Sequence, residues 1–281
     1  MPLVQMKDIL TKANQENYGV GAFSVANMEM VMGAIKAAEE LSSPLILQIA
    51  EVRLNHSPIH MIGPLMVAAA KKAIVPVAVH FDHGMTFQKI QETLEIGFSS
   101  VMFDGSHYPL EENIQKTKEI VELAKQYGAT VEAEIGRVGG SEDGSEDIEM
   151  LLTSTTEAKR FAEETDVDAL AVAIGNAHGM YNGDPNLRLD RLQEINEVVH
   201  IPLVLHGGSG ISPENFKQCI QHGVRKVNVA TATFQNVITA VNNTVLNNPY
   251  SDYFTYHQDV IEAAYENVKS HMQIFGSENR V

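Results

Sequence analysis

The sequence predicts an α/β fold in which eight parallel strands alternate with helices and close into a (β/α)8 TIM barrel, followed by additional C-terminal helices. Eight short apolar runs recur along the 281 residues, and helix-like segments separate them. Their spacing of about 20–40 residues is what one strand–helix unit occupies. A doubly wound sheet is the alternative, but it normally has fewer strands and a glycine-rich turn after the first, which is missing here. We therefore expect a single barrel domain over residues 1–281.

The expected strands are rich in Val, Ile, Leu and Ala. Nearly continuous apolar runs suit strands that are buried on both faces, as in a parallel sheet. The runs lie at residues 20–25, 45–50, 77–82, 100–104, 131–136, 169–174, 202–207 and 225–230.

The segments between the strands have a helical period. Residues 28–41 and 111–127 each place their apolar side chains on one side of a helix. Ser212 is followed directly by proline, which predicts an N-cap and a first helical position, and Ser154 begins an S-x-x-E capping box. Residues 253–275 predict the additional C-terminal helix.

Composition excludes several classes of partner. Lys and Arg number 20 against 36 Asp and Glu, a net charge of −16 that repels nucleic acid and anionic membranes. No apolar run approaches the roughly 18–20 residues of a membrane span, and no signal peptide is evident at the N-terminus. Cys219 is the only cysteine and is expected to be a buried, inert thiol. We expect a soluble, cytoplasmic protein.

Three expected strands end in a histidine followed directly by glycine: His83, His178 and His206. Because the chemistry of a barrel lies at the C-terminal ends of its strands, ring closure brings these histidines toward one mouth. Three neutral imidazoles with an open fourth position describe a catalytic zinc site. On spacing alone, His80 and His107 remain competing ligands.

Other polar features surround these histidines. Asp82, Asp104 and Glu134 also lie at strand ends and could orient the imidazole rings by accepting their N–H groups. The glycine-rich turn at 207–210 precedes a helix start and predicts phosphate binding, with a tight turn without ligand as the alternative. The long acidic segment at 137–147 predicts a loop that could act as a lid.

Five motifs link the chain to a known family. They are His-Phe-Asp-His-Gly at 80–84, Val-Glu-Ala-Glu-Ile-Gly at 131–136 with Gly-Gly-Ser-Glu-Asp at 139–143, Ala-Val-Ala-Ile-Gly-Asn-Ala-His-Gly at 171–179, Leu-Val-Leu-His-Gly-Gly-Ser-Gly at 203–210 and Lys-Val-Asn-Val-Ala-Thr at 226–231. Over essentially its whole length the chain resembles class II, metal-dependent ketose-bisphosphate aldolases, which include fructose- and tagatose-1,6-bisphosphate aldolases. Ala230 makes the last motif look more like the tagatose branch.

The resemblance implies reversible aldol cleavage of a phosphorylated ketose to dihydroxyacetone phosphate and an aldehyde, which is glyceraldehyde 3-phosphate for the bisphosphates. It implies one zinc ion on His83, His178 and His206, which acts as a Lewis acid on the ketone and stabilises the enediolate. Asp82 would exchange a proton with the C4 hydroxyl, and Glu142 would move a proton at the carbon alpha to the ketone.

The resemblance also implies what surrounds the metal. Asp104 and Glu134 match acidic positions near it, as carboxylates that orient its ligands or as alternate ligands. A monovalent cation, Na+ or K+, and a homodimer or homotetramer that uses the C-terminal helices are further family properties. The C1 phosphate would lie on Gly179, Gly207, Gly208, Ser209, Asn228, Val229, Ala230 and Thr231.

Departures from the family pattern concern the far end of the substrate. Ser24 stands where relatives usually have Asn, and Ala50 where some have Ser. Residues 248–251, Asn-Pro-Tyr-Ser, replace an Asp-Pro-Arg segment whose Arg typically holds the distal phosphate, although Arg53 could reach the mouth. The alternative substrate is therefore a ketose 1-phosphate that lacks the distal phosphate.

Two further functions stay open at this point. Three histidines with acidic partners also suit a metal-dependent hydrolase, but such sites usually need a paired H-x-H, and His80 and His83 are separated by two residues. The departures at Ser24 and Ala50 leave room for an inactive sugar-phosphate-binding protein. Lysines are scarce at the strand ends, which argues against a Schiff-base aldolase.

Overall fold

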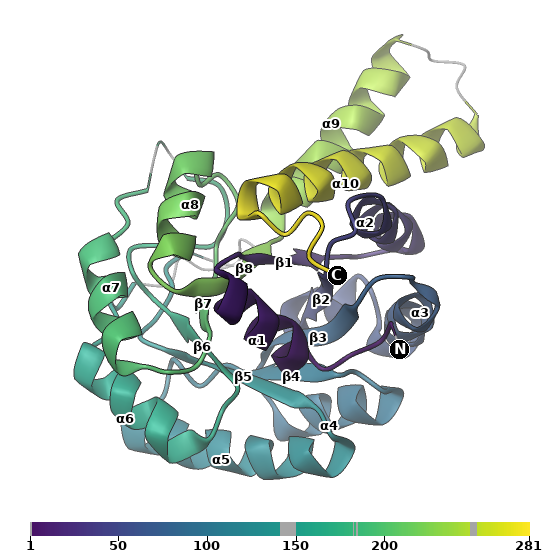
Figure 1. Cartoon of the computed structure of the whole chain (residues 1–281). Coiled ribbons are helices and arrows are strands. Elements are labelled where there is room, and N and C mark those ends of the chain that lie inside the picture. The colour runs from purple at the N-terminus through teal and green to yellow at the C-terminus, as the bar shows by residue number, and fades with distance from the viewer. Residues whose placement is uncertain (1, 141–149, 182, 184, 248–251) are drawn as a thin grey trace.

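The computed structural model describes residues 2–140, 150–181, 183, 185–247 and 252–281, and within them eight parallel strands close into a barrel in sequence order (Figure 1). This confirms the predicted (β/α)8 fold, and every expected run contains a strand. The strands are β1 Val20–Ser24, β2 Leu45–Ala50, β3 Val77–Gly84, β4 Ser100–Phe103, β5 Thr130–Ile135, β6 Ala169–Val172, β7 Leu203–Leu205 and β8 Val224–Val229.

Helices surround the barrel, and their start signals act as predicted. The helices are α1 Met6–Glu16, α2 Met28–Glu40, η1 Glu51–Asn55, α3 Ile59–Lys72, α4 Phe87–Ile96, α5 Leu110–Tyr127, α6 Thr155–Thr165, α7 Leu189–Val198, α8 Pro213–Gln221, α9 Thr231–Asn247 and α10 Tyr253–Phe275. At the start of α8 the Ser212 side chain accepts a hydrogen bond from the backbone of Asn215, and at the start of α6 the Ser154 side chain accepts one from the backbone of Glu157.

The core has two parts, because every strand is buried on both faces. The larger part fills the space between the strands and the surrounding helices. The smaller part lies inside the barrel, where Met6 and Leu10 of α1 pack on small side chains such as Ala22 and Ala171. Helix α1 thus closes the N-terminal end of the barrel (Figure 1), and the C-terminal end remains for substrate.

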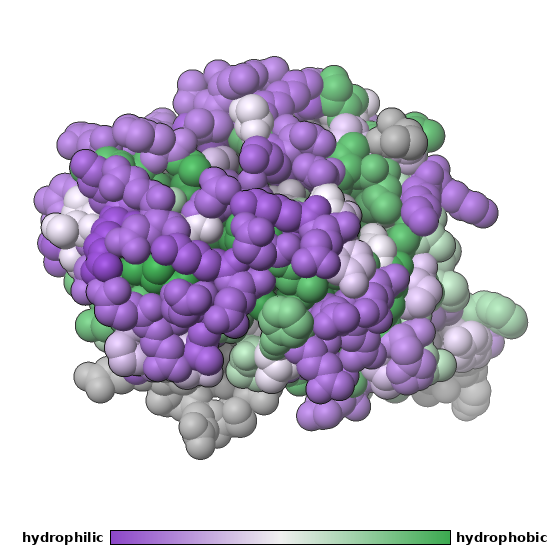
Figure 2. Space-filling view, turned by 90° about the horizontal axis from the view of Figure 1, so that it is seen from below, coloured by the Kyte–Doolittle hydropathy of each residue, from purple (hydrophilic) through white to green (hydrophobic). Residues whose placement is uncertain are grey.

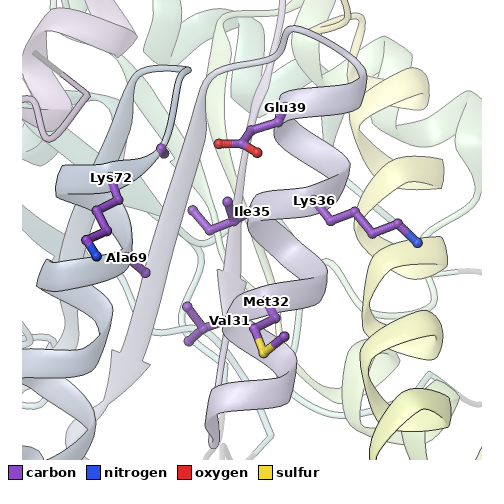
Figure 3. Close-up of a pocket in the computed structure, with 8 residues that line it drawn as sticks. Val31, Met32, Ile35, Lys36, Glu39, Ala69 and Lys72 are labelled. Carbon is purple, nitrogen blue, oxygen red and sulfur yellow. The ribbon is translucent and has the colours of Figure 1, made fainter.

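The C-terminal helix α10 packs along α2 on the outside of β1. The approach is close at Gly33, where a Cβ would lie 2.5 Å from the carbonyl oxygen of Ile261. Figure 3 shows Lys36 of α2 reaching toward α10, and its ammonium lies 2.8 Å from Glu262. The same view shows a groove between α2 and α3 that is lined mainly by aliphatic side chains such as Ile35. This groove lies on the outer helical layer, away from the barrel mouth.

The outer surface matches the acidic composition. Figure 2 shows mostly hydrophilic residues on the side formed by α4, α5 and α6, with smaller hydrophobic areas between them. Within the described residues, none of the helices combines the length and apolar character of a membrane span.

Candidate metal centre and active site

Three histidines converge at the C-terminal end of the barrel. His83 is the second-last residue of β3, His178 lies in the loop after β6, and His206 follows β7. One nitrogen from each ring lies within 4.8 Å of the others, and the ring centroids are 4.6 to 6.0 Å apart. The two competing histidines lie elsewhere: His80 is hydrogen-bonded to Ser100 inside the barrel, and the exposed His107 stacks on its neighbour Tyr108.

The hydrogen bonds of two rings define which nitrogens face the centre. His83 Nδ1 lies 2.6 Å from Asp104 Oδ2, and His206 Nε2 lies 2.9 Å from Glu132 Oε1. A carboxylate accepts, so each of these nitrogens donates a proton. The other nitrogens, His83 Nε2 and His206 Nδ1, then carry lone pairs and face each other at 2.9 Å. Facing lone pairs repel unless a cation lies beside both, so this arrangement fits a zinc ion, whose bonds to imidazole are about 2.0–2.1 Å long.

Burial favours the protonation states that a metal ligand needs. It lowers the pKa of His206 well below its ordinary value, and the neighbouring His83 lowers it further. Burial alone would raise the pKa of Asp104, but the hydrogen bond and the charge of His83, together with hydrogen bonds from Ser106, outweigh it and hold that pKa below its usual range. Burial, together with the nearby Asp104, raises the pKa of Glu134 to about 8. A neutral imidazole at position 206 and an ionised carboxylate at position 104 are the forms that bind and orient around a metal.

The backbone at His83 is strained. Its φ is 45°, in the left-handed region, and the register between β3 and β4 shifts between Phe81 and Gly84. A non-glycine residue held there costs on the order of 1–3 kcal/mol and persists only where its surroundings fix it. The bulge turns the ring of His83 toward the centre, since a bulge re-aims the side chain it carries.

The loop that holds His178 is joined to both neighbouring strand ends. The backbone N–H of His178 donates to Gly139 O at 2.7 Å. A Cβ on Gly140 would lie 2.5 Å from His178 O, so only glycine allows this approach. On the other side, the buried side chain of Asn176 donates to His206 O at 3.0 Å. These contacts fix His178 relative to His206.

Asp82 lies beside His83 on β3, with 1% of its surface exposed. Both of its oxygens accept amide hydrogen bonds at 3.0 Å, Oδ1 from Asn228 on β8 and Oδ2 from Gln48 on β2. Two donors fix the orientation of the carboxylate at the barrel mouth. Glu142, the other predicted catalytic carboxylate, lies outside the described residues.

The glycine-rich turn after β7 packs tightly against the loop after β6. Gly207 has a φ of +64°, and a Cβ there would lie 2.1 Å from Ala177 O. The hydroxyl of Tyr181 donates to Gly207 O at 2.8 Å, and Gly208 N donates to Asn228 O at 2.9 Å. The turn is therefore fixed to both neighbouring strand ends.

Helix α9 begins beside this turn. The Ser209 hydroxyl accepts a hydrogen bond from Ala232 N at 2.9 Å, which joins the turn to the first turn of α9. The expected phosphate-binding residues Ala230 and Thr231 lie at the start of that helix, and Val229 ends β8. Gly179 has open space where a Cβ would be. Backbone N–H groups at a helix N-terminus favour anions.

Sequence reasoning missed three polar residues inside the barrel: Glu132, Lys226 and Gln48. All three are completely buried. Polar residues at alternate positions of an apolar strand were the available signal, because positions i and i+2 face the same side. Glu132 with Glu134 on β5, and Lys226 with Asn228 on β8, form such pairs.

Comparisons with known proteins agree on the family. The sequence profile of the family described as fructose-bisphosphate aldolase class-II matches residues 4–280. A fructose-bisphosphate aldolase of Staphylococcus aureus is 38% identical, over 100% of this chain and 99% of the relative. A sulfofructosephosphate aldolase of Alkalicoccus urumqiensis is 37% identical over the same shares.

A solved structure gives the same result. The YdjI aldolase from Escherichia coli K12 superposes with a TM-score of 0.88 at 34% identity, covering 98% of both chains. A hydrolase, which the histidines alone left open, has no support from these relatives. The chain belongs to the class II fructose-bisphosphate aldolase family.

Proposed function

We propose that this chain catalyses the zinc-dependent, reversible aldol cleavage of a phosphorylated ketose to dihydroxyacetone phosphate and an aldehyde. The 2.9 Å approach of His83 Nε2 to His206 Nδ1, each ring backed by a carboxylate, is the observation that carries the proposal. Family membership supports the reaction class.

The residues of the site divide the chemistry between them. His83, His178 and His206 hold the zinc ion, which when bound supplies Lewis-acid polarisation of the C2 ketone. In the cleavage direction, Asp82 accepts the proton of the C4 hydroxyl. The C3–C4 bond then breaks, C4 becomes the aldehyde, and the electron pair moves onto C3 in conjugation with the C2 carbonyl. Glu142 delivers a proton to C3, a role proposed from sequence resemblance.

The C1 phosphate is proposed to lie between the Gly207–Gly210 turn and the N-terminus of α9. The hydrogen bond from Ala232 N to Ser209 Oγ joins the two elements. With a net charge of −16, the surface as a whole repels a phosphorylated substrate. Backbone amides and the helix dipole supply the local attraction instead.

The distal end of the substrate is proposed to extend toward β1 and β2. Because the C1 phosphate is placed beside β7 and β8, the carbons beyond C4 are proposed to lie past Asp82 on the side of Gln48 of β2, which donates to Asp82 Oδ2. Arg53 is in η1, directly after β2, and its guanidinium lies 5.5 Å from the Phe234 ring of α9. A guanidinium there suits a second phosphate or another terminal anion. The alternative substrate is a ketose 1-phosphate without that second phosphate. The similarity to a sulfofructosephosphate aldolase is a reason to retain this alternative.

An assay for dihydroxyacetone phosphate release tests this function. Fructose and tagatose 1,6-bisphosphates are compared with their 1-phosphates, with and without a chelator. We expect cleavage that chelation abolishes and zinc restores; no release from any of the four ketoses would instead indicate an inactive sugar-phosphate-binding protein. A preference of about 100-fold or more for a bisphosphate, roughly 2.7 kcal/mol, would exclude the 1-phosphate alternative. Repeating the assay in Na+, K+ and tetramethylammonium tests the expected monovalent cation.

A homo-oligomer formed through α9 and α10 is also proposed. The two helices extend together beyond the barrel (Figure 1), and Thr233 is the only buried residue of α9. Their exposed side chains include Leu246, Tyr253 and Phe254. Large exposed apolar side chains on a pair of packed helices suit a protein interface. Light scattering on the whole chain and on a Leu246→Glu/Phe254→Glu variant tests it, with a monomeric variant expected.

A further inference from the structure

Inside the barrel, beneath the histidines, lies an ion pair that the proposed mechanism does not use. Lys226 of β8 and Glu132 of β5 both have 0% exposure, and Lys226 Nζ lies 2.8 Å from Glu132 Oε2. Burying two charges costs several kcal/mol per ion, so such a pair is not explained by stability alone. The layer below it is apolar, with Met6 and Leu10 packed on small side chains, which shows that this barrel can be filled without charge.

The glutamate of this pair is hydrogen-bonded to a proposed metal ligand, His206. Glu132 uses Oε2 for Lys226 and Oε1 for His206 Nε2, at 2.9 Å. With the lysine on one oxygen, the carboxylate presents the other to the imidazole N–H in a fixed orientation. That hydrogen bond keeps the proton on Nε2 and leaves Nδ1 as the lone-pair nitrogen that faces His83.

The lysine of this pair is connected through Asn228 to the proposed acid–base carboxylate, Asp82. Lys226 Nζ donates to Asn228 Oδ1 at 2.7 Å, and Asn228 Nδ2 donates to Asp82 Oδ1 at 3.0 Å. An amide can be flipped, but a lysine has only donors and must face the amide oxygen. Lys226 thus fixes which end of Asn228 meets Asp82.

His80 is the other basic group at this level, but it does not join the two sides. Its Nε2 lies 3.7 Å from both Asp82 Oδ1 and Glu132 Oε2, which is too long for a hydrogen bond. Its Nδ1 is hydrogen-bonded to Ser100. Of the two basic groups, Lys226 alone contacts the supports of both His206 and Asp82.

We propose that Lys226 is a positioning residue that sets two functional groups at once, the tautomer of His206 through Glu132 and the orientation of Asp82 through Asn228. This inference rests on the proposed function, since it takes His206 as a metal ligand and Asp82 as the acid–base group. One buried cation then determines both the metal affinity and the proton transfer.

The test uses Lys226→Met, with Arg225→Met as the matched control. Arg225 is the neighbouring buried cation on the same strand, but it bonds to Asn14 and Asn17 near the end of α1. The readouts are zinc affinity by competition with a chelator and the His206 tautomer by 15N NMR of the metal-free protein. Neither needs substrate, so both can be judged even if wild-type protein cleaves no ketose phosphate.

We expect Lys226→Met to weaken zinc binding about 10–100-fold, as loss of support behind a ligand does, and to shift the His206 tautomer. Arg225→Met should lower stability and leave both readouts unchanged. Wild-type zinc affinity and an unchanged tautomer in folded Lys226→Met would overturn the proposal.

A double variant, Glu132→Gln/Lys226→Met, keeps the test decisive if Lys226→Met does not fold. A neutral amide needs no counter-charge, and its oxygen can still accept from His206 Nε2. Without Lys226, however, nothing fixes this amide, and its NH2 can also turn toward the ring, so zinc affinity should stay about 10–100-fold below wild type, and a crystal structure should show the Asn228 amide released from its fixed orientation. An Asn228 amide that still donates to Asp82 as in the wild type would overturn the second half of the proposal.

Discussion

His83 and His206 meet through their inner ring nitrogens at 2.9 Å, and each ring is held from behind by a carboxylate, Asp104 for one and Glu132 for the other. Because both outer nitrogens donate, the protein holds two lone pairs toward one point in space. The arrangement is pre-organised for a cation. Stability, and not only activity, should therefore depend on zinc.

Zinc should raise the thermal stability of the wild-type chain, and His206→Ala should remove the effect. A ligand at about 1,000 times its Kd stabilises a fold by about 4 kcal/mol, which is several degrees in Tm. Differential scanning calorimetry with chelator and with zinc measures the shift. His107→Ala, at an exposed histidine outside the cluster, is the control and should keep the shift. A full zinc-dependent shift in His206→Ala would show that the ligand assignment is wrong.

Asp104→Asn should weaken zinc binding about 10–100-fold without unfolding the chain. The carboxylate accepts from His83 Nδ1 at 2.6 Å, and an amide can turn its NH2 toward the ring and favour the wrong tautomer. Chelator competition measures the affinity. Asp190→Asn, which breaks an exposed pair with Arg188, is the matched control. Equal affinities in the two variants would contradict an orienting role for Asp104.

Asp82→Asn should lower kcat about 10²–10⁴-fold, the range expected when a general acid–base group is lost. Zinc affinity should change little, because Asp82 is hydrogen-bonded to Gln48 and Asn228 and not to the three histidines. Steady-state kinetics beside a zinc titration separates the two effects. If zinc affinity falls in parallel with activity, Asp82 acts in metal binding and not in proton transfer.

The sequence predicted the barrel because its signal is repeated: eight apolar runs at regular spacing leave few other arrangements. The predicted ends of the strands were less accurate, because polar residues that follow an apolar run can still form backbone hydrogen bonds to the neighbouring strand. The run expected at 77–82 forms a strand that continues to Gly84, past a bulge that hydropathy cannot reveal.

The site was only partly predictable. Histidine before glycine is visible as a pattern, and His83, His178 and His206 lie together in space. The partner of His206 was not predicted, because Glu132 and Glu134 look equivalent in the sequence. Register decides between them: Glu132 Oε1 reaches His206 Nε2, whereas Glu134 Oε1 accepts from the backbone of Val138. Lys226 was overlooked because it lies within a strand and not at its end.

Arg53→Met should lower kcat/KM for a ketose bisphosphate about 10–100-fold and leave the matching 1-phosphate nearly unchanged. A hydrogen bond to a charged group contributes about 1.5–3 kcal/mol, which gives this range. Because a 1-phosphate has no distal anion, it serves as the internal control, and Arg188→Met, at the residue that precedes α7, controls for loss of a surface arginine. Equal losses on both substrates would show that Arg53 supports the fold of the mouth and does not select the substrate.

Acid should destabilise the fold through His271, whose ring is enclosed by Phe23, Phe216 and Phe275. Burial lowers its pKa below 6.5, so as the pH falls below that value the unfolded chain takes up a proton that the folded chain refuses. As the pH falls, the free energy of unfolding therefore decreases, by up to about 1.4 kcal/mol per pH unit for one group. Above pH 7 this group has no effect on it.

Urea unfolding of metal-free wild type and His271→Gln at pH 7.5 and 5.5 measures this dependence. Removing zinc avoids the proton uptake that accompanies metal release. The variant should be less stable at pH 7.5, because it leaves the aromatic cluster poorly filled, yet lose less stability on acidification than wild type does. His107→Gln, at an exposed histidine, should keep the wild-type slope. His80 and His206 share the lowered pKa of buried imidazoles, so part of the slope must remain in His271→Gln. If the free energy of unfolding of His271→Gln changes with pH as much as that of wild type, His271 does not contribute, and the acid sensitivity comes from the histidines inside the barrel.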